Sequence, residues 1–551
     1  MNIKRDMTQL PEQARRPGTG PVRTHRPVYE NSLPPCNHAC PAGEDIQGWL
    51  ALAQDGEFEQ AWQSLVANNP MPAVHGRACY HPCETACNRA QVDQSVSIHS
   101  VERFLGDMAM KNGWKPDFNA ADSGKKILVV GAGPSGLSCA WHLRRLGHSV
   151  EIRDAGPMAG GMMHFGIPSY RLPRDVLDGE IDRIVQTGVK LTLNHKVEDV
   201  LAEKVEGGFD AVFMAIGAHL ARRVDIPARD SGKILDAVSY LRSVKEGESP
   251  KLGRRVAIYG GGNSAVDAAR TAQRMGADEA MIIYRRDYER MPATEAEMEE
   301  AVEEGIKVNW LRSIKTIDAD KITVEKMKID EDGKIRATGE LETLEADSLI
   351  LALGQHVDTS VLSRIDGLQI NDDGVVVVSH NMMTTVEGVF AGGDMVPSER
   401  TITIATGHGK KAARCIDAWL QDSDYVKPPP KRLNDYTELA LWFNTDAQAS
   451  SQPVVSPEMR ISDFKEIVGG LNEEQALYES SRCYSCGNCF ECDGCYGACP
   501  EQAVIKLGKG NYYRFDYDKC TGCRACYDQC PCHAIVMVGE HEIASGQEET
   551  Q

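Results

Sequence analysis

The cysteines near the C-terminus are the residues whose spacing most directly indicates chemistry. The pattern Cys-x-x-Cys-x-x-Cys-x-x-x-Cys-Pro occurs twice, first from residue 489 and again from residue 520. In this pattern the fourth cysteine of each run ligates the cluster of the other run, so the spacing predicts two 4Fe-4S clusters. Structural zinc sites favour paired cysteines and have no need of such a repeat. The expected ligand sets are Cys489, Cys492, Cys495 and Cys530 for one cluster, and Cys499, Cys520, Cys523 and Cys526 for the other.

Three further cysteines flank these runs. Cys483 and Cys486 precede the first run, and Cys532 follows the second. We treat all three as non-ligands, although the upstream pair could take part in an alternative ligation.

A second group of cysteines lies near the N-terminus, around short helical segments. Residues four positions apart lie on one face of a helix, so thiolates with this spacing can converge on one metal centre. An iron-sulfur cluster is expected here, and zinc is the competing metal. The group consists of Cys36 and Cys40, followed by Cys79, Cys83 and Cys87.

A glycine-rich loop between these cysteine groups predicts a dinucleotide-binding site. An apolar run, residues 127–130, leads into Gly-x-Gly-x-x-Gly and then into a helical pattern. Such glycines allow a tight turn and let helix N-terminal amides face a pyrophosphate, while an acid ending the next strand can hold a ribose hydroxyl. The expected binding residues are Gly131, Gly133, Pro134, Ser135, Gly136 and Asp154.

A second loop of the same kind lies within the span of the first domain. The strand at residues 254–259 runs into Gly260 and Gly262, and Asn263 and Ser264 then open a helix. The following strand ends in Arg285 and Arg286 instead of an acid. A ribose diol requires a carboxylate at that position, whereas a 2'-phosphate requires guanidinium groups. The pair therefore favours NADPH over NADH, though surface arginines after a strand are common.

Composition narrows the function classes. The chain has 551 residues, enough for several domains, and a net charge of −20. Without a basic block, nucleic acid and anionic membranes are not expected partners. We find no apolar run near 18 residues and no signal peptide, so we expect a cytoplasmic protein without membrane insertion. In that compartment, 18 cysteines in tight clusters indicate metal ligands and not disulfides.

Several of these motifs together resemble a known family. The runs CNHACPAGEDIQGWL, GRACYHPCETACNR and SIHSVERFLGD, followed by GAGPSG, resemble the small subunit of glutamate synthase and its relatives, including the N-terminal part of dihydropyrimidine dehydrogenase. The likeness extends from about residue 31 to 425. Those proteins carry two N-terminal 4Fe-4S clusters. This chain lacks the Cys-x-x-Cys pair that normally precedes the position of Cys36.

The resemblance implies that one N-terminal cluster remains. By position it would use Cys40, Cys79 and Cys83, with Glu102 near the place of a non-cysteine ligand. The other cluster has lost half its ligands and is not expected to assemble. Cys36 and Cys87 would then be remnants of that missing cluster, or one of them could supply the fourth ligand of the remaining one.

The resemblance also implies FAD at the first glycine loop. The segment Gly160 to Pro173, which contains Gly161 and Arg171, resembles the family's flavin-flanking segment. Apolar strands end in small-residue turns at Gly217, Gly354 and Gly393, and Asp394 stands where similar flavoproteins bond the ribityl chain. The helix beginning near Thr403 would direct its N-terminal dipole at the pyrimidine end of the flavin.

The lack of a redox Cys-x-x-Cys beside the predicted flavin site argues against a thiol-reducing enzyme. Flavin disulfide reductases need a redox Cys-x-x-Cys beside the flavin, but no cysteine lies between Cys139 and Cys415. These two single residues are interpreted as core positions. Electrons must therefore leave the flavin by another route.

We predict a multidomain fold: an α-helical iron-sulfur N-terminal domain, two nested Rossmann-like α/β nucleotide-binding domains and a C-terminal α+β domain like bacterial ferredoxin. The linker, residues 426–478, is expected either to wrap a neighbouring surface or to be a flexible tether. The N-terminal arm, residues 1–33, is expected either to dock on another part of the protein or to be disordered. The expected segments are an extended arm (1–33), the iron-sulfur domain (34–120), the FAD domain (121–245 and 346–425), the NAD(P) domain (246–345), the linker (426–478), the two-cluster domain (479–538) and a tail (539–551).

These carriers together predict a protein that transfers electrons. A hydride brings two electrons at once and a cluster accepts one, so a flavin is needed between them. Two function classes remain. The chain could be an NAD(P)H dehydrogenase that reduces a diffusing ferredoxin. It could instead be a subunit whose catalytic partners lie on other chains, as in glutamate synthase or, by a closer likeness, the flavin subunits of 2-oxoacid:acceptor oxidoreductases. We favour the second class.

Overall fold

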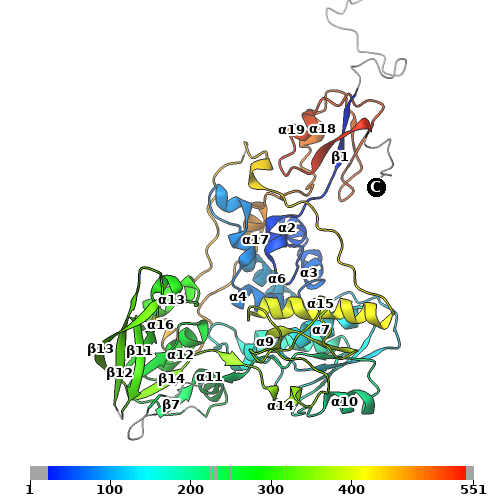
Figure 1. Cartoon of the computed structure of the whole chain (residues 1–551). Helices are drawn as coiled ribbons and strands as arrows, with labels where there is room; N and C mark the ends of the chain where they lie inside the picture. Colours follow the sequence, from blue (N-terminus) through cyan, green and yellow to red (C-terminus); the bar gives the residue numbers. More distant parts are fainter. Residues whose placement is uncertain are drawn as a thin grey trace, which may run out of the picture.

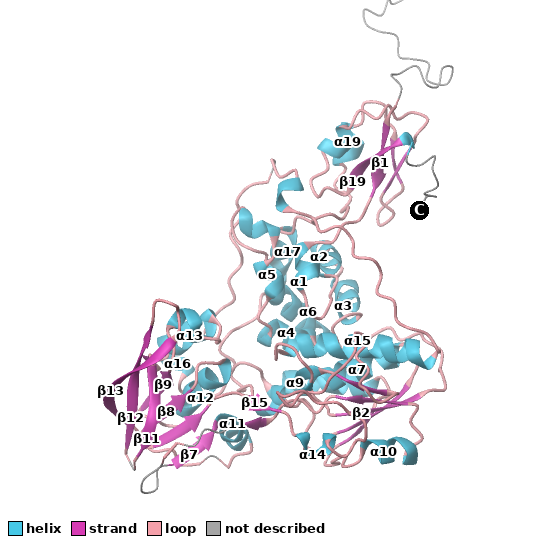
Figure 2. Ribbon diagram, in the orientation of Figure 1, coloured by secondary structure: helices cyan, strands magenta, loops and turns pink. Residues whose placement is uncertain are grey.

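The computed structural model describes residues 23–221, 226–227, 233–248, 250–318, 320–442 and 444–541. The molecule is elongated (Figure 1), with two α/β domains side by side at its base. A helical domain lies above one of them, and a small module forms the tip. Chain segments from both ends of the sequence meet in this module (Figure 2). None of the helices in the described ranges is long and apolar enough to cross a membrane.

The helical domain packs around large buried aromatic side chains. Trp49 and Trp62 are fully buried, and their core is continuous with that of the neighbouring α/β domain. The indole of Trp141, from that domain, donates a hydrogen bond to the carbonyl of Val66 at 2.9 Å. The two domains therefore share one apolar interior. The helices are α1 (Pro35–Ala39), α2 (Ile46–Gln54), α3 (Phe58–Val66), α4 (Pro72–Ala78), α5 (Pro82–Thr85), η1 (Asn88–Gln91) and α6 (Ile98–Asn112).

The first α/β domain has a five-stranded parallel sheet with the order β16-β5-β2-β3-β4. Its central strand β2 is almost entirely apolar and buried, as expected for a parallel sheet covered on both faces. The strands are β2 (Lys126–Val130), β3 (Ser149–Arg153), β4 (Lys190–Thr192), β5 (Ala211–Met214) and β16 (Val389–Ala391). The helices are α7 (Pro134–Arg145), α8 (Met162–Phe165), α9 (Arg174–Gln186), α10 (Val200–Glu206), α14 (Thr359–Leu362) and α15 (Ile402–Leu420), with η3 (Gly393–Met395).

The second α/β domain repeats this architecture. Its parallel sheet has the order β10-β9-β8-β14-β7, and a three-stranded antiparallel sheet, β11-β12-β13, packs beside it. A short pair, β6 (Leu220–Ala221) with β15 (Gln355–His356), joins the two α/β domains. The strands are β7 (Lys233–Asp236), β8 (Arg255–Tyr259), β9 (Glu279–Tyr284), β10 (Lys307–Trp310), β11 (Arg312–Ile317), β12 (Lys321–Ile329), β13 (Ile335–Glu345) and β14 (Ser348–Leu351). The helices are α11 (Ala237–Lys245), α12 (Asn263–Arg274), η2 (Tyr288–Arg290) and α13 (Glu295–Glu303).

The module at the tip combines the start and the end of the described chain. Strand β1 (His25–Tyr29) pairs antiparallel with β19 (Ile535–Gly539), and β17 (Val504–Lys506) pairs with β18 (Tyr513–Phe515). Two short helices, α18 (Gly494–Ala498) and α19 (Ala525–Asp528), complete it. Part of the predicted N-terminal arm therefore docks as a strand. Its residues 1–22 and the tail after residue 541 lie outside the described residues.

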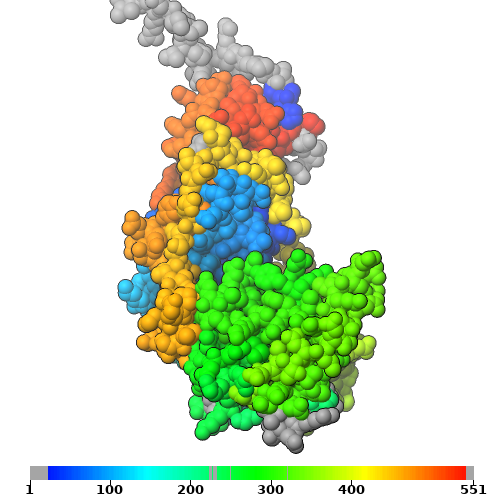
Figure 3. Space-filling view, turned by 90° about the vertical axis from the view of Figure 1, so that its left-hand side faces the viewer, coloured from blue at the N-terminus to red at the C-terminus, as the bar shows by residue number. Residues whose placement is uncertain are grey.

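The segment after α15 runs along the side of the molecule. Figure 3 shows this yellow and orange segment against the blue helical domain and reaching the green second α/β domain. Glu466 pairs with Arg77 of α4 at 2.7 Å, and Arg460 pairs with Glu303 of α13 at 2.9 Å. The segment therefore wraps neighbouring surfaces and is not a free tether. It contains η4 (Tyr436–Glu438), α16 (Pro457–Arg460) and α17 (Glu473–Ser481).

Candidate functional site: two nucleotide loops and four cysteine groups

The first glycine loop connects β2 to α7 at the carboxyl edge of the first sheet. Gly131 has φ +108°, and a Cβ there would meet the carbonyl oxygen of Ala215 at 2.3 Å. Asp154, just after β3, accepts hydrogen bonds from the amides of Ala132 and Gly156, each at 2.7 Å. The carboxylate therefore fixes the loop that it borders.

Open space and an unpaired hydroxyl mark the same loop. A Cβ added to Gly133 would meet no atom within 4 Å, and a Cβ at Gly161 would lie 3.0 Å from the Cα of Gly133. The buried hydroxyl of Ser135, in the first turn of α7, has no hydrogen-bond partner among the described residues. A diphosphate over this turn would satisfy that hydroxyl and the helix amides, so the residues present fit the pyrophosphate of FAD.

Helix α15 begins beside this loop. Asp394 is largely buried, and burial raises its pKa to about 6 while Arg400 opposes the shift. Gly393 has φ +73°, and a Cβ there would lie 3.0 Å from Cβ of Ser135. Thr403, in the first turn of α15, is buried. The structure thus brings Asp394 and the start of α15 together with the first glycine loop, where the sequence predicts the flavin.

Thr403 also contacts the nearest cysteine group. Its hydroxyl donates to Sγ of Cys79 at 3.1 Å. Both residues line a cavity of about 330 Å³ with Cys40, Cys83 and Glu102. The structure therefore brings together the four residues expected for the remaining N-terminal cluster, directly against the helix that borders the flavin site.

Several buried polar side chains stand among the largely apolar walls of this cavity. Asn69 donates to the carboxylates of Glu44 and Glu102, at 2.9 and 2.8 Å. Burial, and then the carboxylate of Glu44, raise the pKa of Glu102. His75 is held neutral, because burial lowers its pKa to about 3. Lys410 of α15 donates to the carbonyls of Ala42 and Gly43 at 3.0 and 2.6 Å, so it ties the helix to the loop after Cys40.

The two C-terminal cysteine groups assemble with the crossed pattern. Cys499 lines a cavity of about 330 Å³ with the first three cysteines of the second run. Cys530 lies beside the first three of the first run: after burial, the residues that raise the pKa of Cys489 include Cys495, Cys530 and Cys492. Cys532 is buried, with Sγ 3.8 Å from Sγ of Cys530. The cysteines of the second run at this cavity are Cys520, Cys523 and Cys526.

Cys36 and Cys87 do not join the Cys40 group. They line a separate cavity of about 360 Å³, and its other cysteines are Cys483 and Cys486. The sequence predicts these last two as non-ligands or as a pair in an alternative ligation. It predicts Cys36 and Cys87 as remnants, or one of them as the fourth ligand of the Cys40 group. One signal could have paired them: the sequence lacks one Cys-x-x-Cys before residue 36 and has one in excess at residue 483.

The second glycine loop connects β8 to α12 and lies next to the helical domain. A Cβ at Gly262 would meet nothing within 4 Å, and Tyr284 packs on Gly261. The side-chain oxygen of Asn263 accepts from the amide of Thr294 at 3.1 Å, and its amide donates to the hydroxyl of Tyr80. Gly260 has φ +150°. The second dinucleotide loop therefore borders the N-terminal domain directly.

The remaining predicted residues take distinct places. Arg285 is exposed at the end of β9, and Arg286 follows it half-buried. Ser264 lies in the first turn of α12. Arg171 instead pairs with Asp267 at 2.9 Å and also with Glu297, so its guanidinium lies between the two α/β domains. Gly217 and Gly354, both with left-handed φ, stand at the turns beside the β6 and β15 pair.

The fold and the site define a flavoprotein with two dinucleotide-binding domains and attached iron-sulfur domains. Residues 125–409 match the family described as pyridine nucleotide-disulphide oxidoreductase, and the chain belongs to this family. Residues 27–114 match domain II of dihydropyrimidine dehydrogenase, a 4Fe-4S cluster domain. Residues 513–536 match a 4Fe-4S binding domain. The predicted FAD, pyridine nucleotide and 4Fe-4S clusters at both ends of the chain are confirmed as cofactors of these domains.

Relatives that match over most of the chain agree with the predicted resemblance. The beta subunit of an NADP(+)-dependent formate dehydrogenase of Moorella thermoacetica is 34% identical, covering 82% of this chain and 70% of that protein. The beta subunit of an NADPH-Fe(3+) oxidoreductase of Geobacter sulfurreducens is 31% identical, covering 84% and 76%. The NADPH glutamate synthase small chain of Escherichia coli is 30% identical, covering 70% and 89%. The solved thioredoxin reductase of T. acidophilum is 22% identical over 54% of this chain and 99% of that one, with a TM-score of 0.43.

Proposed function

We propose that this chain is the electron-transfer subunit of an NAD(P)H-dependent oxidoreductase complex. In this role it moves electrons between a pyridine nucleotide, FAD and 4Fe-4S clusters. The observation that carries the proposal is the position of Thr403. It begins the helix beside the flavin loop, and its hydroxyl donates to Sγ of Cys79 at 3.1 Å. One side chain therefore joins the flavin site to the first cysteine group.

The residues around the two glycine loops would hold FAD and the pyridine nucleotide. FAD, when bound, supplies the exchange between two-electron and one-electron transfer. Asp154 holds the first glycine loop and would accept from a ribose hydroxyl. Asp394, largely buried beside the same loop, would bond the ribityl chain. Arg285 and Arg286 would bind a 2'-phosphate, which favours NADPH. The names of relatives with NADPH or NADP(+) support this preference.

The proposed domains follow the core structure. Residues 34–120 form the helical iron-sulfur domain. The predicted FAD domain (121–245 and 346–425) is too wide, because β7, α11 and β14 belong to the sheet and core of the second α/β domain. The NAD(P) domain, predicted as 246–345, therefore also includes these three elements. Residues 479–538 form a ferredoxin-like domain, which β1 extends. The separate apolar cores of the second α/β domain and of the tip module support these divisions.

The electrons leave the flavin through clusters and not through thiols. Cys139 on α7 and Cys415 on α15 are both buried in the apolar core, and burial, followed by Cys415, raises the pKa of the Cys139 thiol, as expected for core positions and not for a reactive thiolate. The proposed cluster ligands are Cys40, Cys79, Cys83 and Glu102 near the flavin, and the crossed sets of the two repeats at the tip.

The partner is proposed to be a catalytic subunit on another chain. Two of the relatives above are named as beta subunits, one of a formate dehydrogenase and one of an NADPH-Fe(3+) oxidoreductase. A 2-oxoacid:acceptor oxidoreductase is a further candidate of the same kind. The second candidate function is a stand-alone NAD(P)H:ferredoxin oxidoreductase, which the two-cluster module at the tip would also serve.

Anoxic purification at low salt from the native source tests this assignment. We expect a catalytic subunit, carrying its own substrate site, to copurify in fixed ratio with this chain. Mass spectrometry of the isolated complex identifies that subunit and with it the substrate. Isolation of the chain alone, with full clusters and rapid NAD(P)H-driven ferredoxin reduction, would contradict the subunit assignment and support the second candidate.

A further inference from the structure

The cavity at Cys36 collects two pairs of cysteines from opposite ends of the sequence. Cys36 begins the helical domain and Cys87 ends its second cysteine run, while Cys483 and Cys486 follow α17. The amide of Asn88 donates to Sγ of Cys486 at 3.5 Å, across 398 positions of sequence. All four cysteines are free. After burial, the groups that raise the pKa of Cys36 are Cys483, Cys87 and Cys486, so the four sulfurs are neighbours.

We propose that Cys36, Cys87, Cys483 and Cys486 hold a further 4Fe-4S cluster. The later part of the chain would thus supply the ligand pair that the N-terminal region lacks. Its cavity, about 360 Å³, is close in size to the cavities of about 330 Å³ at two other cysteine groups. A single zinc ion, with sulfurs about 2.3 Å away, needs ligand atoms close to one another, and among the described residues no three of these cysteines have their sulfurs within 4.8 Å of one another.

The backbone around Cys483 and Cys486 matches that of the ferredoxin-type pairs. The residue two positions after the first cysteine is left-handed in each: Ser485 (φ +50°), Glu491 (+59°) and Gly522 (+71°). The residue after the second cysteine is left-handed as well, and only one of the three is glycine: Gly487 (+81°), Asp493 (+64°) and Arg524 (+70°). Left-handed residues other than glycine are uncommon, so the shared conformation indicates a shared task.

Hydrogen bonds to sulfur follow the same pattern. The amide of Ser485 donates to Sγ of Cys483 at 3.4 Å, as the amide of Gly522 does to Cys520 at 3.4 Å. Such bonds favour the thiolate form that binds iron. The hydroxyl of Ser485 accepts from Gln47 of α2 at 3.3 Å in a buried contact. The loop is therefore fixed against the N-terminal domain.

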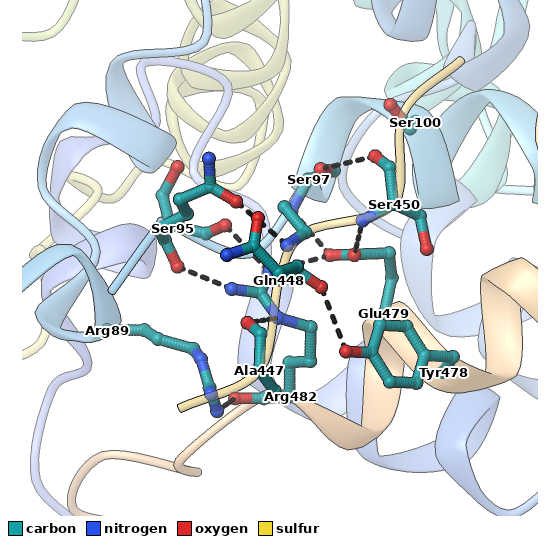
Figure 4. A network of polar contacts seen from close by, with 12 residues as sticks. Arg89, Ser95, Ser97, Ser100, Ala447, Gln448, Ser450, Tyr478, Glu479 and Arg482 are labelled. Atoms are coloured by element: carbon teal, nitrogen blue, oxygen red, sulfur yellow. Dashed lines mark hydrogen bonds and ion pairs between the residues drawn. The ribbon is translucent and has the colours of Figure 1, made fainter. Parts of the chain in front are cut away.

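A buried ion pair next to Cys483 holds this attachment. Figure 4 shows Arg482 and Glu479 between the helical domain and the wrapping segment. Arg482 donates to Glu479 at 3.0 Å and to the carbonyls of Ser95 and Ala447 at 2.9 and 3.1 Å. Arg89 in turn donates to the carbonyl of Arg482 at 2.9 Å. Because Glu479 and Arg482 are almost fully buried, they position the cysteine that follows.

The site lies between the other cysteine groups. The carbonyl of Gly487 accepts from Ser32 at 2.9 Å, and its amide donates to the carbonyl of Cys532 in the tip module at 2.6 Å. The cluster would therefore stand between the tip module and the Cys40 group. Its role as a relay, which rests on the proposed function, is to accept one electron from one neighbour and give one to the other. Two successive one-electron transfers through the cluster therefore carry the two electrons of one hydride.

Iron and sulfide analysis of the anaerobically purified full-length chain tests the site. With four clusters we expect about sixteen iron atoms per chain, whereas three clusters would give about twelve. Cys483→Ala and Cys36→Ala should each lose about four, with FAD content unchanged, and the double variant should lose no more because both residues serve one cluster. Cys415→Ala, a buried cysteine outside the cavities, is the matched control and should lose none.

The iron content of the wild-type chain requires no variant, so it tests the fourth cluster even where a substitution impairs folding. About twelve iron atoms with one zinc per chain, or additive losses in the double variant, would overturn the site. The relay is tested separately by rapid reduction with NADPH. We expect Cys483→Ala to slow reduction of the tip clusters more than tenfold while flavin reduction keeps its rate. Unchanged tip-cluster reduction in a chain that has lost the iron would overturn the relay alone.

Discussion

At the scale of single residues, the hydroxyl of Thr403 is the contact that links the two kinds of carrier. It is buried at the start of α15 and donates to Sγ of Cys79 at 3.1 Å. Hydrogen bonds to cluster sulfurs stabilise the more negative, reduced state and so raise the reduction potential. This side chain is therefore placed to tune the cluster that exchanges electrons with the flavin.

Thr403→Val removes this hydrogen bond while keeping the shape of the side chain. We expect the reduction potential of the adjacent cluster to fall by on the order of tens of millivolts, measured by EPR-monitored redox titration. Thr403→Ser keeps the hydroxyl and is the matched control, with a potential near that of the wild type. An equal fall in both variants would assign the effect to packing and not to the hydrogen bond.

We propose that Arg285 sets the coenzyme preference. Its guanidinium is exposed at the end of β9, where a 2'-phosphate would lie. Arg285→Ala should weaken NADPH binding about tenfold or more, because a hydrogen bond to a charged group is lost, and leave NADH binding nearly unchanged. Titration of both coenzymes measures this, with the exposed Arg254→Ala as control. Equal losses for NADPH and NADH would remove the argument for a 2'-phosphate site.

At the scale of elements, α12 and the end of α13 depend on a buried charge cluster. The carboxylate of Glu304 accepts from Arg270 and Arg274, each at 2.7 Å, and all three side chains are shielded from solvent. Burial alone would raise the pKa of Glu304, but the hydrogen bonds from Arg274 and Arg270 hold it below its usual range. The ion cluster fixes the helix that carries the second glycine loop.

Glu304→Gln should destabilise the protein by about 3 kcal/mol at neutral pH, since it removes the carboxylate that pairs with the buried guanidinium of Arg274 and leaves Arg270 with Glu300 alone. Because the folded pKa is depressed, the stabilisation by Glu304 is present above its unfolded pKa and is lost as the pH falls through its folded value. The gap between variant and wild type in urea unfolding should therefore shrink below about pH 4. The exposed Glu299→Gln on α13 is the control, and a pH-independent gap would contradict the charge argument.

Local sequence patterns predict the glycine loops and the cysteine repeats of the site. The grouping of cysteines from distant parts of the chain depends on the tertiary fold and could not be predicted in this way. The glycine loops and the cysteine repeats are local signals, because strand, turn and helix follow one another along the chain. The grouping of Cys36 with Cys483 depends on where α17 docks, which the buried pair of Glu479 and Arg482 determines. Spacing along the chain does not show where this segment docks, so only the count of Cys-x-x-Cys pairs, one missing before residue 36 and one in excess at residue 483, connects the two regions.

At the scale of the whole molecule, the sites proposed for FAD, pyridine nucleotide and clusters follow the long axis. The nucleotide domains lie at the base, the helical domain above them and the two-cluster module at the tip (Figure 1). The wrapping segment runs beside all three, and ion pairs such as that of Arg77 with Glu466 attach it. This arrangement separates the site of hydride transfer from the surface where electrons leave or enter.

Cys526→Ala should remove one tip cluster and leave the base intact. We expect a loss of about four iron atoms per chain with FAD retained, because Cys526 lies in the cavity at the far end of the molecule from the flavin loop. NADPH should still reduce the flavin, whereas transfer to the physiological acceptor should be lost. Full transfer in this variant would mean that the tip clusters are not on the path.

The most direct measurement is rapid anaerobic mixing of the full chain with regenerated excess NADPH, followed by absorbance and by freeze-quench EPR. We expect the flavin absorbance to bleach first and the cluster signals to appear afterwards, those of the tip module included. In Cys526→Ala the first phase should persist while part of the second disappears. Flavin that stays reduced over oxidised clusters, in the wild-type chain, would contradict the claim that this protein transfers electrons from nucleotide to clusters.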